Sequence, residues 1–274
     1  MIIKFKDGKS KALTFSYDDG TVQDIRLMEI FNRYGLKATF NINTGCYFPE
    51  DGVRERYYGR MKLSEAKDLY INSGHEIAVH SLTHPGLEKL DTGEIVYEIM
   101  EDRKNIESTY GTIARGMAYP NGTYNRKVID VIKACGICYA RTIKPTESFN
   151  LPEEWLELHP TCHHRHPALL DMADEFLNKP ENANTCRLFY VWGHSFNFDN
   201  EDNWNVIEEF GKKVSRKNDV WYATNIEIYD YVQAYNSLVI SADRKIITNL
   251  SAIDVWLNDG KETFVIKPGE TLFR

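Results

Sequence analysis

Two pairs of residues in the first third of the sequence have side chains that bind metal ions or move protons. Asp18 and Asp19 follow the apolar run 12–17 and precede a glycine. Neighbouring residues at the end of a strand point in different directions, so one carboxylate can bind a metal ion while the other handles a proton. Taken alone, an Asp-Asp-Gly run is more often a simple turn.

The second pair is His80 and His84, in the run His-Ser-Leu-Thr-His. Two imidazoles four residues apart can converge on one side of a helical turn and bind one ion. This spacing alone is a modest signal, because solvated or buried histidines are about as common. Two histidines and one carboxylate are a frequent ligand set for a catalytic divalent ion. The two pairs together therefore predict a metal centre better than either pair alone.

Two later segments contain groups that suit hydrolysis. Asn121 lies in Tyr119-Pro-Asn-Gly, and its backbone N–H can point at a developing oxyanion, although a plain turn has the same pattern. His194 lies in Trp192-Gly-His, at the end of an apolar run. Histidine is the side chain best suited to donate a proton near neutral pH, so His194 is a candidate general acid.

These residues need elements that bring them together. Short apolar runs alternate with amphipathic segments, which is typical of parallel strands joined by crossover helices. The expected strands cover residues 12–17, 37–43, 76–80, 113–119, 137–141, 187–192 and 220–224. About seven such units favour a distorted, TIM-like (β/α) barrel over an open doubly wound sheet, which is the alternative. A barrel would place the strand ends at one catalytic face.

Local signals predict where the helices begin and end. The expected starts are a capping box at Thr21, Ser64 as an N-cap and Asp91 before a long helix, and the expected ends are Gly35, Gly74, Gly111 and Gly136. From residue 236 the pattern changes to short strand-like runs separated by turn signals. The sequence thus predicts a barrel domain over residues 1–235 and a small antiparallel β extension over residues 236–274.

The composition narrows the class of function. The 274 residues are 42% hydrophobic and have a net charge of -7, which argues against a surface for nucleic acid or anionic membrane. The five cysteines are expected to be buried thiols, with redox chemistry at Cys135 and Cys138 as a minor alternative. No signal peptide or transmembrane run is recognised, so a cytoplasmic location is expected. The oligomeric state is left open.

The order Asp-Asp-Gly, His-x-x-x-His, Tyr-Pro-Asn-Gly and Trp-Gly-His resembles the NodB-like polysaccharide deacetylases, carbohydrate esterase family four, over roughly residues 10–235. The resemblance implies a distorted (β/α) barrel that removes acetyl groups from N- or O-acetylated carbohydrate. It also implies one divalent metal ion, Zn²⁺ first, with Co²⁺, Ni²⁺ or Mn²⁺ as alternatives.

The resemblance also gives each motif a role. It makes Asp18 the base that activates a metal-bound water, and it makes the metal ligands Asp19, His80 and His84. The N–H of Asn121 would contribute to an oxyanion hole, and His194 would protonate the leaving group. The side chains expected to contact the substrate are Tyr17, Tyr119, Trp192 and His163.

This chain departs from the family pattern at two positions. The arginine that usually pairs with the catalytic base is Ala118 here. Arg141 is expected to replace it, because the end of a neighbouring strand can reach across the mouth of a barrel, whereas Arg115 is expected to face another layer. The fourth motif of the family is unclear, and Glu154-Trp155 is its candidate substitute.

Two other functions remain open. One is an amidohydrolase of a small cyclic amide or ureide on the same fold, as in allantoinase-like chains, which tend to lack the carboxylate found here as Asp18. The other is a catalytically decayed carbohydrate-binding barrel, which Ala118 favours and the intact Asp and His residues disfavour. Residues 159–166 contain four of the eight histidines and are expected beside the catalytic mouth, with a second metal site as the less favoured alternative.

Overall fold

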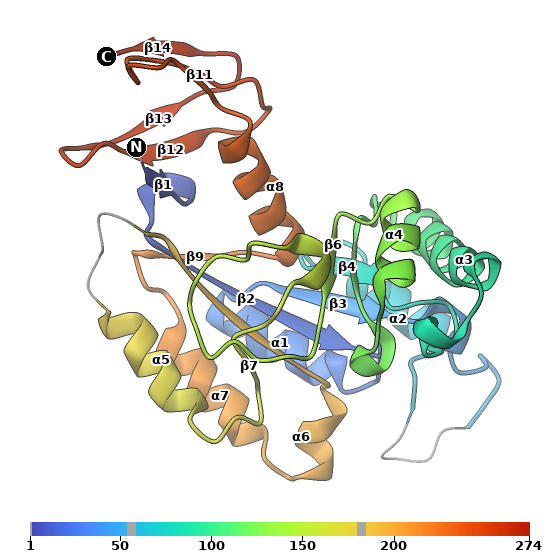
Figure 1. The fold of residues 1–274 in the computed structure, drawn as a ribbon. Coiled ribbons are helices and arrows are strands. Elements are labelled where there is room, and N and C mark those ends of the chain that lie inside the picture. Colours follow the sequence, from blue (N-terminus) through green and yellow to red (C-terminus); the bar gives the residue numbers. More distant parts are fainter. Residues whose placement is uncertain (1, 54–58, 180–184) are drawn as a thin grey trace.

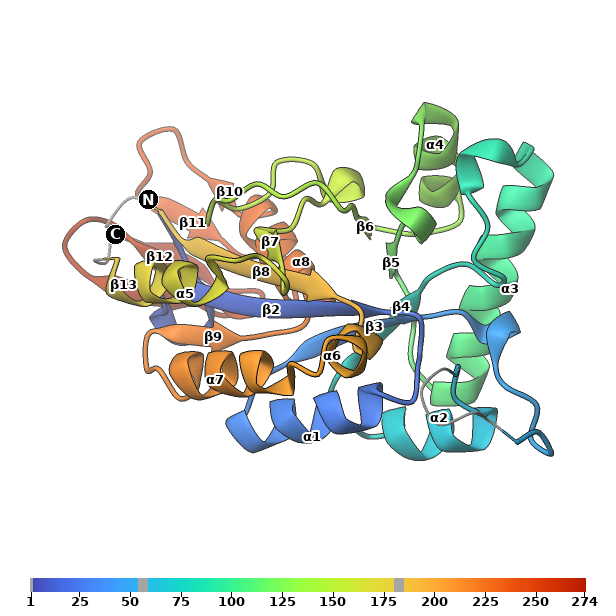
Figure 2. The same ribbon diagram turned by 90° about the horizontal axis from the view of Figure 1, so that it is seen from below.

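The computed structural model describes residues 2–53, 59–179 and 185–274. Its central sheet contains β2 (Lys11–Asp18), β3 (Ala38–Ile42), β4 (Glu76–Val79), β5 (Gly116–Ala118), β6 (Tyr139–Arg141), β7 (Cys162–His163), β8 (Arg187–Gly193) and β9 (Val220–Tyr222). The strands are parallel and follow the order β6-β5-β4-β3-β2-β8-β7, and β9 pairs with β2 (Figures 1 and 2). The curled sheet confirms the predicted distorted (β/α) barrel.

Strand β2 lies at the centre of this sheet. One edge of β2 pairs with β8 along most of its length, and the other edge pairs first with β9 and then with β3. Every residue of β2 is buried, as expected for a parallel strand that is covered on both faces. Asp18, its last residue, pairs with Asn41 of β3, so Asp18 lies at the carboxyl end of the sheet.

Eight α-helices of the described residues pack around the sheet. They are α1 (Asp24–Tyr34), α2 (Leu63–Tyr70), α3 (Thr92–Tyr110), α4 (Arg126–Ala134), α5 (Leu169–Asn178), α6 (Phe196–Asn200), α7 (Trp204–Val214) and α8 (Asn225–Asn236). Helix α7 packs between α1 and α5, and α3 packs between α2 and α4 (Figure 1). Phe15 of β2 contacts Phe31 of α1 and Phe210 of α7, with ring centroids 4.6 and 5.8 Å away. Buried rings of this kind each contribute about 1.5–3 kcal/mol to the core.

An irregular segment after β6 closes the curl of the sheet. The N–H of Leu158 donates to the carbonyl of Ala140 at 2.9 Å, and the carbonyl of Leu158 accepts from Thr142 at 3.0 Å. A few residues later, Cys162 and His163 of β7 pair with β8. The segment therefore connects the two sides of the sheet, and it brings His163 next to Trp192.

Helix signals in the sequence are confirmed for α3. The carboxylate of Asp91 accepts from the N–H of Glu94 at 2.9 Å, and the carboxylate of Glu94 accepts from the N–H of Asp91 at 2.8 Å. Gly111 ends α3, and Gly35 ends α1, each with φ 66°. These left-handed conformations strongly favour a residue without a Cβ atom, which explains why glycine marks both ends.

Three other helix predictions are wrong. Helix α1 begins at Asp24 without a side-chain cap, because the hydroxyl of Thr21 bonds to Ser195 at 3.0 Å instead. Ser64 lies inside α2 rather than before it, and α2 ends at Tyr70 rather than near Gly74. The hydroxyl and N–H of Ser64 both bond to the carboxylate of Glu50, a partner that local sequence does not reveal.

The C-terminal region contains the antiparallel strands that were expected, in two three-stranded sheets. One sheet has the order β1-β12-β13 and the other has the order β10-β11-β14, formed by β1 (Ile2–Lys4), β10 (Val239–Ile240), β11 (Ile246–Thr248), β12 (Val255–Asn258), β13 (Thr263–Ile266) and β14 (Thr271–Phe273). The first strand of the chain thus belongs to the sheet of the C-terminal region (Figure 1). The domain boundary at residue 235 stays a prediction.

The cysteines of the chain are free thiols. Burial raises the pKa of Cys138 to about 11 and that of Cys162 to about 12, so these thiols stay protonated and unreactive. Among the described helices, none has the length and the apolar character that a bilayer crossing requires.

Candidate active site

The carboxylate of Asp18 is buried and held by partners from two other strands of the sheet, β3 and β6. Asn41 of β3 donates to Oδ1 at 2.8 Å, and Arg141 of β6 donates to Oδ2. Burial alone would raise the pKa of Asp18, but the charges of Arg141, His80 and His194 and the hydrogen bond from Arg141 lower it to about 2. Asp18 is therefore ionised at neutral pH.

Arg141 reaches this position because of the register between β5 and β6. Ala118 and Arg141 are direct partners across the two strands, so the arginine missing at position 118 is supplied one strand further along the sheet. The guanidinium of Arg141 is completely buried and lies 4.3 Å above the ring of Trp192. Arg115 forms two hydrogen bonds to Asp230 of α8 instead, at 2.6 and 3.0 Å. The structure thus separates the two arginines as the sequence predicts.

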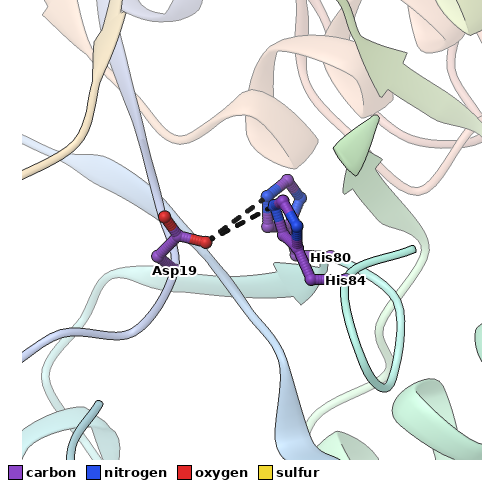
Figure 3. Close-up of side chains that lie close together, drawn as sticks. All are labelled: Asp19, His80 and His84. Carbon is purple, nitrogen blue, oxygen red and sulfur yellow. Dashed lines mark ion pairs between the residues drawn. The ribbon is translucent and has the colours of Figure 1, made fainter. Parts of the chain in front are cut away.

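The side chains of Asp19, His80 and His84 converge at one point (Figure 3). Oδ1 of Asp19 lies 3.9 Å from Nε2 of His80 and 3.6 Å from Nε2 of His84. One candidate ligand atom from each residue lies within 4.8 Å of the other two, and this is the one such group among the described residues. The sequence prediction of a shared site for these three residues therefore agrees with the geometry.

Loops, not a helical turn, bring the two histidines together. Ser81 and His84 have φ values of 64° and 63°, which no helix contains, and the N–H of His84 donates to the hydroxyl of Ser81 at 3.1 Å. The expectation of a helical turn is wrong on this point. The ring planes of His80 and His84 meet at 69°, with centroids 4.8 Å apart.

His80 has the protonation state that a metal ligand needs. Its Nδ1 lies 2.9 Å from the carbonyl oxygen of Ala118, and a hydrogen bond donated there leaves the lone pair of Nε2 directed toward Asp19. Burial lowers the pKa of His80 to about 4, despite the two nearby aspartates, so the ring is neutral at pH 7. Two imidazoles and a carboxylate around one point fit a divalent metal ion such as Zn²⁺.

His194 faces both carboxylates from the end of β8. Its Nε2 lies 3.9 Å from Oδ2 of Asp18 and 3.9 Å from Oδ2 of Asp19, and its side chain is 27% exposed. Asn121 lies in the 3₁₀ turn Pro120–Gly122 that follows β5, with φ 58° and an exposed side chain. The predicted contribution of its N–H to an oxyanion hole stays a prediction.

The four predicted substrate contacts divide into two groups. Trp192 and His163 lie edge to face, with ring centroids 4.5 Å apart, and both line a cavity of about 330 Å³. Tyr17 is completely buried and stacks on His164, while the hydroxyl of Tyr119, also buried, donates to the carbonyl of Leu156 at 2.8 Å. The burial of the two tyrosines leaves no surface for a sugar, so we do not propose them as substrate contacts.

The histidine-rich segment does lie beside the site, as expected. His163 contacts Trp192 and its ring centroid is 6.3 Å from that of His194, whereas His164 is buried between Tyr17 and Phe198. The candidate substitute for the fourth family motif is elsewhere. Trp155 packs edge-on against Tyr229 of α8, with ring centroids 5.1 Å apart.

Sequence reasoning missed Arg60 and two asparagines. Arg60 donates from Nη2 to Oδ1 of Asp19 at 3.0 Å and from Nη1 to Oδ1 of Asn43 at 2.7 Å. Asn41 and Asn43 lie at the end of the expected strand 37–43, so the strand-end argument that singled out Asp18 could have found them. Nothing in the local sequence pattern singles out Arg60.

Comparison with known proteins gives the same family as the motifs. Residues 5–140 match the family model described as polysaccharide deacetylase. The uncharacterized protein YlxY of Bacillus subtilis is 32% identical over 106 residues, which are 39% of this chain and 29% of that protein. The peptidoglycan-N-acetylglucosamine deacetylase PgdA of Listeria monocytogenes is 28% identical over 131 residues, 47% of this chain and 25% of that protein. The chain thus covers a minor part of these relatives' length.

Solved structures share the fold at low sequence identity. A provisionally assigned polysaccharide deacetylase from Mycobacterium smegmatis superposes with a TM-score of 0.60 and 16% identity, over 86% of this chain and 94% of that one. A family 4 acetyl xylan esterase from Clostridium thermocellum, in complex with a cobalt ion, gives 0.50 and 16% over 80% and 90% of the two chains. The motif order and the family match over residues 5–140 agree on the NodB-like polysaccharide deacetylases, and the solved structures share the fold.

Proposed function

We propose that this chain is a metal-dependent hydrolase that removes acetyl groups from N- or O-acetylated carbohydrate. The observation that carries the proposal is the convergence of Asp19, His80 and His84 on one point, beside an ionised Asp18. Family membership supports carbohydrate deacetylation, and the geometry supplies the groups that such a reaction needs.

Asp19, His80 and His84 would hold one divalent ion, for which Zn²⁺ is the first candidate. Such an ion, when bound, polarises a carbonyl and makes water more acidic. The carbonyl of Ala118 fixes the ring of His80, so that Nε2 is the atom available as ligand. The three residues leave the rest of the coordination sphere to water and substrate.

Asp18 is placed to accept the proton of the attacking water. Its two oxygens are fixed by Asn41 and Arg141, so the carboxylate cannot rotate away from the neighbouring Asp19. The low pKa of Asp18 keeps it ionised and ready to accept a proton throughout the physiological range. His194, 3.9 Å from both carboxylates, is placed to donate a proton to the leaving amine or alkoxide.

Trp192 and His163 would contact the acetylated sugar. Both line the open cavity next to Arg141 and His194, and an indole face suits an acetyl methyl group. The relative PgdA is named for activity on peptidoglycan N-acetylglucosamine, and this makes N-acetylated hexosamines the first substrates to test.

Acetate release is the direct test. Purified chain loaded with Zn²⁺ or Co²⁺ is incubated with N-acetylglucosamine oligomers and with acetylated xylan oligomers, and Asp18→Asn serves as the matched control. We expect release from at least one panel by the wild type and only background release by the variant. Hydrolysis of a cyclic ureide without acetate release would support the amidohydrolase alternative. Sugar binding without any hydrolysis would support the decayed barrel.

A further inference from the structure

We infer that Arg60 is a positioning residue that sets the geometry, and thereby the strength, of the metal site. This inference rests on the proposed function, because it assumes that Asp19, His80 and His84 hold a metal ion. No motif of the sequence assigns a role to Arg60, and the hydrogen bonds of its guanidinium carry the argument.

Arg60 holds Asp19 at two points. Nη2 donates to the Oδ1 atom of Asp19 at 3.0 Å, which is the same oxygen that faces His80 and His84 (Figure 3). Nη1 donates to the backbone carbonyl of Asp19. Asp19 has φ 86°, a left-handed conformation that is strained for a residue with a side chain and persists only where its surroundings enforce it. Arg60 thus forms hydrogen bonds to both the backbone and the carboxylate of Asp19.

The same guanidinium also reaches the histidine side of the site. Nη1 of Arg60 donates to Oδ1 of Asn43 at 2.7 Å, and Nδ2 of Asn43 donates to the carbonyls of His80, at 2.5 Å, and Ser81, at 2.9 Å. Asn43 is 2% exposed. Arg60 therefore connects two ligand-bearing segments that come from different strands, through Asp19 on one side and Asn43 on the other.

Backbone pairing with the turn after β2 holds Arg60 close to both Asp19 and Asn43. Arg60 forms an antiparallel bridge with Thr21. On either side of it, the N–H of Met61 donates to Gly20 at 3.1 Å and the N–H of Val22 donates to Gly59 at 3.2 Å. The arginine is thus attached to the turn that directly follows Asp19, so its side chain needs little further ordering.

A planar fork explains why this residue is an arginine. A guanidinium holds its donors in one rigid plane, so its carboxylate, carbonyl and amide partners are kept in a fixed arrangement, whereas the three donors of an ammonium rotate freely. Its positive charge opposes the binding of a dication, so the positioning effect has to be measured at constant charge. Outer-sphere partners of metal ligands typically change metal affinity by about 10–100-fold.

Arg60→Lys keeps the charge and removes the fork, and Arg115→Lys is the matched control, because Arg115 is paired with Asp230 away from the site. The Zn²⁺ dissociation constant is measured by competition with a chromophoric chelator. The visible spectrum of the Co²⁺-loaded protein reports the ligand geometry. We expect Arg60→Lys to weaken Zn²⁺ binding by about tenfold or more and to shift the Co²⁺ bands, while Arg115→Lys matches the wild type. Arg60→Gln, which keeps one amide donor, should bind the metal and show the same shifted Co²⁺ bands.

Unchanged affinity and an unchanged Co²⁺ spectrum in Arg60→Lys would overturn the inference. Tighter Zn²⁺ binding by Arg60→Lys, at unchanged charge, would also overturn it, because the guanidinium would then weaken the site rather than support it. A change in KM with an unaltered metal dissociation constant would make Arg60 a substrate contact instead. Wild-type protein that binds metal but releases no acetate would refute the proposed function and leave this inference intact. Wild-type protein that binds neither Zn²⁺ nor Co²⁺ would refute both.

Discussion

Asp18 and Asp19 are neighbours in the chain, but the protein holds them in different ways. The side chain of Asp18 is 3% exposed and bonded by residues of β3 and β6, whereas that of Asp19 is 15% exposed and bonded by an arginine from a loop. The arginine of Asp18 is fixed by sheet register, and the arginine of Asp19 by pairing with the turn after β2. Under the proposed function, two identical carboxylates thereby take different tasks, one for protons and one for a metal ion.

Removing the histidines of the candidate metal site should have the largest effect on metal content and activity. His80→Ala and His84→Ala each delete one of two imidazole ligands, and the double variant should lose its metal and all acetate release above background. Both residues lie at strand ends or in loops, so the fold should persist. Metal content per chain is measured by elemental analysis, with His75→Ala as the control. Full metal occupancy in the double variant would disprove the site.

Neutralising Asp18 should abolish most of the activity but leave metal binding unchanged. Asp18→Asn keeps the size of the side chain and removes the base, so the rate of acetate release should fall by about 10²–10⁴-fold. Metal content should equal that of the wild type, because Asp18 is not part of the ligand group. Wild-type activity in this variant would place the base at another residue and end the division of labour between the two aspartates.

A smaller effect is expected where the orientation of Asp18 alone is changed. Arg141→Lys keeps a positive charge but loses the planar fork that holds Asp18 and lies over Trp192. Misplacement of the base should lower kcat by up to about 10²-fold with metal content unchanged. Arg115→Lys, assayed side by side, should be nearly silent. The reverse ranking would show that Arg115, not Arg141, serves the reaction.

Glu76 is a half-buried carboxylate held by neutral donors, and it should affect stability in the opposite way to Asp18 as the pH changes. Glu76 accepts only from the neutral donors Tyr139, Thr39 and Ile226, and burial raises its pKa from 4.5 to about 6. The folded state then binds more protons than the unfolded state between these values, so the free energy of unfolding should fall as the pH rises from about 4.5 to 6.

Glu76→Gln should reduce the pH-dependent fall in the free energy of unfolding by up to about 2 kcal/mol. This value corresponds to the shift in the pKa of Glu76. Urea unfolding at pH 4 and pH 7 measures it, with Glu209→Gln, an exposed position on α7, as the control. Asp18 has the opposite sign, since its lowered pKa stabilises the fold above about pH 4 and this contribution is lost as the pH falls toward 2. Identical pH profiles for the two glutamine variants would mean that Glu76 ionises normally.

The strand-end residues could be predicted from sequence because strand patterns are local. Asp18, His80 and Arg141 each end or follow an apolar run, and parallel strands bring such ends together. The direction of a side chain could not be predicted in the same way. Every residue of β2 is buried, so hydrophobicity does not reveal that Tyr17 faces Phe31 of α1 while Asp18 faces the site.

Contacts between distant segments explain the other omissions. Arg60 reaches Asp19 because its segment pairs with Thr21. Ser64 does not cap α2, and its hydroxyl donates to Glu50 instead. Strand β7 has two residues and no alternating pattern, although it positions His163. Such contacts depend on tertiary structure, and no local period or turn signal encodes them.

The pairing of β1 with β12 has a consequence for the order in which the chain folds. Ile3 and Leu257 are partners, so β1 is synthesised long before its neighbour β12. The edge of β1 then stays open while the barrel is made, and an unpaired edge invites association with other chains. Because closing so long a loop is slow, we expect β1 to join β12 late in folding. Ribosome-bound chains that stop before β12 should accordingly be more prone to aggregate than the finished protein.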